Sequence, residues 1–340
     1  MKIVRAAGAS LMIAATAYLT YLCVRTFDFD SLEAYLGLRG AMLLSMLVGF
    51  QLLIFSMSTA QWMLLLRSAG VKAGAGEAFF AKLGGVSVNY VSLPIAAGGE
   101  VVRAGLIKKK SSGYGKVSAT IAADKAIEIG TRLPAVAVGL FLISALAAKD
   151  SLLRPLGAGI AVLLVAVVAA GIVLLKRPLS TCDDYRGLHP GGTRRHPVLA
   201  AAQRLMPRLA ARAAHGLSEF RASLNLVLAR KKLLFGAVLF GFSASLIDVL
   251  QLSVLLYELG LTLSGAGLVM YAGSALQGSV AFLPGNVGGM EATSMFVFKI
   301  LGADPGSGIV YALLLRAAQL VWIGVGLGYL AFRALRGRLG

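Results

Sequence analysis

Six long apolar runs constrain this chain more than any other feature of its sequence. A bilayer has a hydrocarbon core about 30 Å thick, and a helix needs roughly 20 apolar residues to cross it. Only 14% of the 340 residues are charged, whereas soluble proteins carry about a quarter. The sequence therefore predicts an all-α, polytopic integral membrane protein that forms a single transmembrane domain over residues 1–340. The predicted spans are Ala6–Val24, Ala41–Leu66, Ile127–Ala147, Leu156–Leu175, Leu233–Tyr257 and Ile309–Phe332.

The basic residues cluster between these spans. The chain has 33 Lys and Arg against 15 Asp and Glu, a net charge of +18. Most of the basic residues lie in segments that would share one side of the membrane, and such segments are cytoplasmic. We therefore expect a multi-pass protein of the bacterial inner membrane with both termini cytoplasmic. Because topology explains the charge, anionic lipid head groups rather than nucleic acid are the expected partners. A second copy of the chain or a lipid-synthesis enzyme is left open as a protein partner.

Two further apolar segments, Glu77–Ile107 and Gly265–Leu301, are interrupted by the same pattern, L-P-x-x-x-G-G. Proline removes a backbone donor and glycine adopts unusual dihedral angles, so the pattern predicts a break in each helix. Each segment is too long for one straight span and short for two, and is either a re-entrant hairpin or a pair of full crossings. The predicted breaks involve Pro94, Gly98 and Gly99 in the first segment and Pro284, Gly285, Gly288 and Gly289 in the second.

Each of the two interrupted segments is flanked by one predicted span on either side. Residues 41–147 and 233–332 each read as span, broken segment, span, and the two patterns are 190 positions apart. The charge bias makes the first segment enter from the cytoplasm and the second from outside. We interpret this as an inverted-topology repeat, a recurring design of membrane transporters.

The segment 176–232 joins the two repeats and carries twelve basic and three acidic residues. Arg204, Arg208 and Arg212 lie at helical spacing, and Leu205 and Leu209 fall on another face. The pattern favours either an amphipathic helix on the inner leaflet or a solvated basic linker that anchors topology.

Ionisable residues within or beside apolar segments are the candidates for function. A charge at the bilayer centre costs about 2.5–3.5 kcal/mol even on permissive scales, and broken backbone is tolerated only inside protein or beside a wet cavity. We therefore predict a polar cavity between the two breaks. Its predicted substrate-binding residues are Glu100, Arg103, Asp124, Lys125, Glu128, Arg132, Asp248, Asn286, Glu291, Arg316 and Gln319.

Each of these interpretations has an alternative. The glycines could serve only to let helices pack closely. The residues from Asp124 to Arg132 could form a self-neutralising ladder at the membrane interface, and Arg316 could simply pair with Glu291. No enzyme motif accompanies the charges, and we expect neither a cofactor nor a metal site.

Three stretches resemble the lysylphosphatidylglycerol synthase transmembrane-region family, the flippase-like membrane portion of bacterial MprF. They are LPIAAGGEVVRAGLIKKK at 93–110, ATIAADKAIEIGTRL at 119–133 and GSVAFLPGNVGGMEATSMFVFKILG at 278–302. In that family an arginine follows the first break, here Arg103, and a glutamate follows the second, here Glu291. An acidic–basic pair opens the next helix, here Asp124–Lys125 where arginine is the more usual base. Lys125 puts in doubt any head-group contact that needs a bidentate arginine.

The resemblance implies a membrane domain with inverted repeats and re-entrant helices that moves a lipid between leaflets. The aminoacyltransferase domain of the full synthase has no counterpart here, because the longest polar segment is 176–232. The leading hypothesis is therefore a non-enzymatic lipid translocase. Its substrate would be an anionic or aminoacylated phospholipid, or a polyprenyl-phosphate-linked lipid. A membrane-embedded lipid-modifying enzyme that uses Asp124 and Glu128, or a non-catalytic partner of a lipid or glycan synthesis complex, are the alternatives.

Overall fold

The computed structural model describes residues 37–92, 98–108, 113–146, 219–220, 222–262, 265–280 and 284–338. In this part of the chain every regular element is a helix, which confirms the predicted all-α class. The predicted spans Ala6–Val24 and Leu156–Leu175, most of the linker 176–232, and Pro94 of the first break lie outside the described residues.

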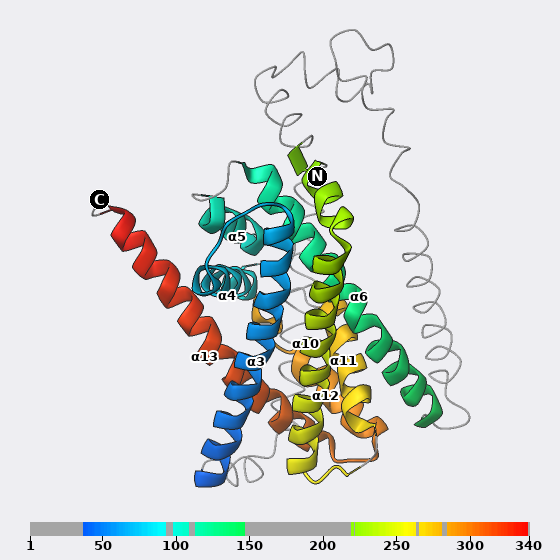
Figure 1. The fold of residues 1–340 in the computed structure, drawn as a ribbon. Helices are drawn as coiled ribbons and strands as arrows, with labels where there is room; N and C mark the ends of the chain where they lie inside the picture. Colours follow the sequence, from blue (N-terminus) through cyan, green and yellow to red (C-terminus); the bar gives the residue numbers. More distant parts are fainter. Residues whose placement is uncertain are drawn as a thin grey trace, which may run out of the picture.

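Four of the described helices are long and apolar enough to cross a bilayer. Each contains or largely overlaps one of the predicted spans, so a multi-pass membrane protein is confirmed. The four are α3 (Leu38–Ser68), α6 (Tyr114–Leu146), α10 (Lys231–Glu258) and α13 (Pro305–Arg338) (Figure 1).

Helix α6 begins at Tyr114, well before the start predicted at Ile127. The added segment contains several alanines, which favour helix. The Gly115 N–H at its start donates a hydrogen bond to the Glu219 carboxylate at 3.2 Å, which satisfies one of the free donors of a helix N-terminus. Asp124 therefore lies about 15 Å along the helix at 1.5 Å per residue, rather than at the start of a span.

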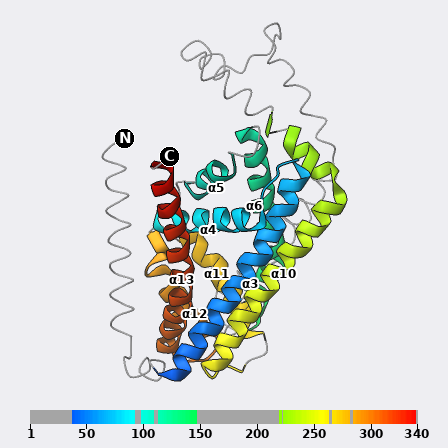
Figure 2. The same ribbon diagram turned by 60° about the vertical axis from the view of Figure 1, so that its left-hand side comes forward.

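The two interrupted segments form pairs of shorter helices. The first pair is α4 (Ala75–Val91) and α5 (Gly98–Lys108), and the second is α11 (Ala266–Val280) and α12 (Gly289–Ile300), separated by the 3-10 turn η2 (Pro284–Asn286). All four helices are shorter than the roughly 20 residues that cross a bilayer. Figure 2 shows α4 lying across the direction of the long helices.

The long helices of the two halves run in opposite directions. Figures 1 and 2 show α3 and α10 packed side by side and antiparallel. Helix α13 packs against α4, and in the same way α6 packs against α11. Glycine allows both close approaches: a Cβ on Gly326 of α13 would overlap Ser87 of α4, and one on Gly139 of α6 would overlap the Leu268 carbonyl of α11. This matched packing supports the inverted repeat over 41–147 and 233–332, which stays a prediction.

Within the described helices, two separate apolar cores hold the bundle together. One core surrounds α4 and α5 and includes Trp62 and Leu65 of α3, while the other surrounds α11 and α12 and includes Leu43 and Leu47 of α3. Helix α6 divides similarly, with its residues up to 123 in the first core and those from 136 in the second. The middle of α3 and α6 is therefore left between the two cores.

Candidate functional site

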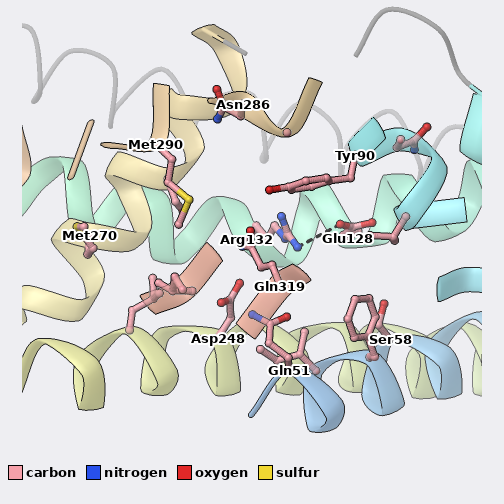
Figure 3. A pocket seen from close by; sticks show the side chains of 18 of the residues that line it. Gln51, Ser58, Tyr90, Glu128, Arg132, Asp248, Met270, Asn286, Met290 and Gln319 are labelled. Carbon is pink, nitrogen blue, oxygen red and sulfur yellow. Dashed lines mark ion pairs between the residues drawn. The ribbon is translucent and has the colours of Figure 1, made fainter. Parts of the chain in front are cut away.

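A cavity of about 560 Å³ lies between the two apolar cores. Its wall is formed by residues 51–58 of α3 and 125–132 of α6, together with parts of α4, α5 and α10 to α13 (Figure 3). Its ionisable residues include four cations and two carboxylates. They are Lys82, Arg103, Lys125, Arg132, Glu128 and Asp248.

The first break brings α4 and α5 into very close contact. A Cβ on Gly99 would overlap the Gly85 carbonyl oxygen, whereas one on Gly98 would lie 3.4 Å from the nearest side-chain atom. The side chain of Asn89 on α4 accepts a hydrogen bond from the Gly99 N–H at 2.8 Å and donates one to Glu100 at 3.2 Å. Gly99 therefore serves helix packing, which was the alternative interpretation of these glycines. Glu100 is held by Asn89 and does not line the cavity.

The second break depends on unusual backbone angles instead. Gly285 and Gly288 have φ of 67° and 80°, in the left-handed region that glycine adopts without a steric penalty, and Asn286 has φ of 50°. The Gly288 N–H, which precedes the first turn of α12, donates a hydrogen bond to the Glu291 carboxylate at 3.0 Å. The ring of Tyr90 from α4 lies against Gly285, where a Cβ would come within 3.0 Å of it. The end of α4 thus contacts the second break.

A buried carboxylate on α6 joins two cations from the first helix pair. Asp124 is completely buried and forms ion pairs with Lys82 Nζ at 3.1 Å and Arg103 Nη2 at 2.7 Å. It also accepts a hydrogen bond from Gln61 Nε2 at 2.8 Å. Lys82 Nζ also donates to the other Asp124 carboxylate oxygen at 3.2 Å and to the Ser58 carbonyl oxygen at 2.8 Å. Because an ammonium group has three donors, all those of Lys82 are occupied.

Arg103 is held on a second side by an aromatic ring. Its guanidinium lies 4.1 Å from the ring centroid of Trp62, and the Trp62 indole N–H donates to Thr120 at 3.2 Å. Only 4% of the Arg103 side chain is exposed. Asp124 therefore serves as the internal counter-ion of Lys82 and Arg103, and this cluster links α3, α4, α5 and α6.

Lys125, Glu128 and Arg132 form a ladder along the cavity side of α6. Lys125 Nζ pairs with Glu128 at 3.0 Å and Arg132 Nη2 pairs with Glu128 at 3.1 Å. Their side chains are 44%, 24% and 48% exposed, in that order along the helix. Both cations retain donors that the ladder does not use. The alternative interpretation was a self-neutralising ladder from Asp124 to Arg132 at the membrane interface, whereas the ladder in the structure has two cations to one anion and lines the cavity.

The second half of the chain has an ion pair of reversed polarity at the corresponding place. Arg316 on α13 lies 2.7 Å from the Glu291 carboxylate on α12, as the alternative interpretation expected. It also donates to the carbonyl oxygens of Gly285 at 2.7 Å and Asn286 at 3.3 Å, and to the Tyr90 hydroxyl at 3.1 Å. In both halves an ion pair thus joins the helix after the break to the following long helix, with the cation on α5 in the first half and on α13 in the second. Arg316 and Glu291 stabilise the second break and do not line the cavity.

Seven of the eleven predicted residues line the cavity, and they come from α5, α6, α10, η2 and α13. Asp124 lies directly behind the wall, while Glu100, Glu291 and Arg316 belong to the helix breaks. Figure 3 shows Asp248 and Arg132 on opposite walls, with Gln319 and Gln51 near them. The lining members are Arg103, Lys125, Glu128, Arg132, Asp248, Asn286 and Gln319.

The sequence prediction omitted several polar residues of the site. Lys82 is the most important, since it lines the cavity and pairs with Asp124. It could have been found by the rule used for the others, because it is an isolated charge within an apolar segment. Gln51, Asn89 and Tyr90 carried no such signal, since uncharged polar residues are common in membrane helices.

The fold and the cavity define a polytopic α-helical membrane protein in which broken helix pairs surround a polar space. Comparison with known proteins places it further: the family model for the lysylphosphatidylglycerol synthase TM region matches residues 7–328, and the chain belongs to that family. It is similar to a "UPF0104 membrane protein" of Methanothermobacter thermautotrophicus, with 21% identity over 262 residues that cover 76% of each chain. No solved structure matches the chain.

Proposed function

We propose that this protein is a lipid translocase, which moves a lipid with an anionic head group between the leaflets of its membrane. The observation that carries the proposal is the charged cavity of about 560 Å³ within an apolar helical bundle. Cavities of this size are typical of ligand sites. A head group could cross the membrane through this space while its acyl chains stay in the hydrocarbon.

Lys125 and Arg132 are the residues that we propose to bind the lipid phosphate. Both line the cavity, have side chains about half exposed, and keep donors beyond those that bind Glu128. The sequence also predicted Arg103 and Arg316 among the substrate-binding residues. Arg103 and Arg316 are instead largely buried and held by Asp124 and Glu291. Position 125 holds a lysine in place of an arginine that could bind a phosphate through two donors. We propose that Arg132, two turns further along the same helix, compensates for this difference.

Reconstitution into liposomes with head-group-labelled anionic lipid tests the proposal. The double variant Lys125→Ala plus Arg132→Ala should flip the lipid at least tenfold more slowly than the wild type. The matched control is Arg39→Ala. Arg39 is an exposed cation that pairs with Glu258 at a distance of 3.3 Å, and neither residue lines the cavity. If wild-type protein moves lipid no faster than protein-free vesicles, or if the double variant matches the control, the proposal is wrong.

Lipid analysis of cells that lack the protein separates this function from the two alternatives. Loss of a translocase changes the leaflet in which a lipid is found, whereas loss of a lipid-modifying enzyme removes a lipid species. A non-catalytic partner of a synthesis complex would tolerate substitution of Lys125 and Arg132 without either change.

A further inference from the structure

Asp248 differs from the other carboxylates around the cavity because it has no partner in the part of the chain that the structure describes. Among the residues that the structure describes, no hydrogen bond or ion pair reaches its side chain, although it lines the cavity from α10. Glu100 is bonded to Asn89, Asp124 to Lys82 and Arg103, Glu128 to Lys125 and Arg132, and Glu291 to Arg316. An intramembrane charge that no structural contact accounts for is a functional candidate.

The groups that face Asp248 come from every helix packed around it. Arg132 and Glu128 on α6 are the charges that act on it, and Tyr271 on α11 and Tyr311 on α13 are its titratable neighbours. Gln51 of α3 lines the same cavity, and its side-chain amide donates a hydrogen bond to Gln251 on α10 at 3.3 Å. The Tyr271 hydroxyl is buried and makes no hydrogen bond of ordinary geometry within the described part of the chain.

These neighbours suit a proton better than a metal ion. A hard cation needs several oxygen ligands, but no cluster of three His, Cys, Asp or Glu exists in the described ranges. The charge that acts most strongly on Asp248 is moreover the Arg132 guanidinium, which repels cations. A proton needs no coordination shell. Binding it also makes the carboxylate neutral, which removes the free-energy cost of an unpaired ion in a medium of low dielectric constant.

We propose that Asp248 is a proton-binding site whose protonation controls the partner of Arg132. When Asp248 binds a proton from the cavity, its carboxylate becomes a neutral carboxylic acid and Arg132 stays with Glu128, as in the structure. When the proton leaves, the Asp248 anion competes with Glu128 for Arg132 and draws α6 and α10 together across the cavity. The coupling of this step to lipid movement rests on the proposed function, whereas proton binding itself does not.

Infrared difference spectroscopy of the full chain in lipid tests proton binding directly. On acidification, wild-type protein should show the carbonyl stretching band of a carboxylic acid shielded from bulk water, and Asp248→Asn should lack that band. Glu258→Gln is the matched control, since it removes a partly exposed carboxylate at the end of the same helix. The band should persist in the control. A band that is unchanged in Asp248→Asn would overturn the inference.

A transport experiment tests the coupling. In proteoliposomes with a difference of one pH unit across the membrane, one proton per lipid shifts the equilibrium distribution of the labelled anionic lipid about tenfold. Wild type and Asp248→Glu should show this shift, and Asp248→Asn should lose it. A shift that persists in Asp248→Asn would refute the coupling, even though the protein moves lipid. If no form of the protein moves lipid, the proposed function fails, and the infrared comparison still decides whether Asp248 binds a proton.

Discussion

Replacing Asp124 by asparagine should destabilise the protein far more than removal of an exposed carboxylate. Asp124 is fully buried, and the two cations that it neutralises, Lys82 and Arg103, have side chains only 5% and 4% exposed. Removing one partner of a buried ion pair costs about 3–5 kcal/mol, because an uncompensated charge is left behind. Asparagine can still accept the hydrogen bond from Gln61, but it leaves two buried cations together. We therefore expect a loss toward the upper end of that range.

The free energy of unfolding, measured by SDS titration in mixed micelles, provides the assay. Glu258→Gln is the control, because its pair with Arg39 is exposed and such pairs contribute about 0–1 kcal/mol. Adding Lys82→Met to Asp124→Asn should restore part of the loss, since it leaves only Arg103 without a carboxylate, and the Trp62 ring still faces that guanidinium. An Asp124→Asn protein as stable as Glu258→Gln would show that this cluster is solvated and would refute the reasoning.

Two further substitutions test the helix breaks. Gly99→Ala should lower the free energy of unfolding by about 1–3 kcal/mol through overpacking, because its Cβ would overlap the Gly85 carbonyl oxygen. Gly98→Ala is the control and should be tolerated. Equal thermal stability of the two variants in detergent would contradict this prediction. Glu291→Gln should destabilise the second break, since it removes the charge partner of Arg316; we expect faster limited proteolysis near that break, and a wild-type cleavage rate would argue against the role.

The sequence was informative where a residue's chemistry is costly in a membrane. Long apolar runs predicted α3, α10 and α13 closely, and isolated charges pointed to most of the ionisable cavity wall. Hydropathy placed the start of α6 too late, because it treats the polar residues before Ile127 as loop although alanine favours their helical form.

The partners of these charges were less predictable. Arg103 and Asp124 lie 21 positions apart, and Gln61 is 63 positions from Asp124, so only the packing of four helices reveals that Asp124 is a counter-ion. Spacing along one helix did predict the pairing of Glu128 with Arg132. The same rule could not show that Asp248 lies opposite them, with no partner among the described residues, since that depends on how α10 crosses α6.

A structure of the full protein in lipid nanodiscs that contain anionic phospholipid would test the central claim most directly. The proposed function predicts density for a phosphate in the cavity, within hydrogen-bonding distance of Lys125 and Arg132, with acyl chains that extend toward the bilayer. A cavity closed by side chains, with Lys125 and Arg132 directed to water at the membrane surface, would contradict it.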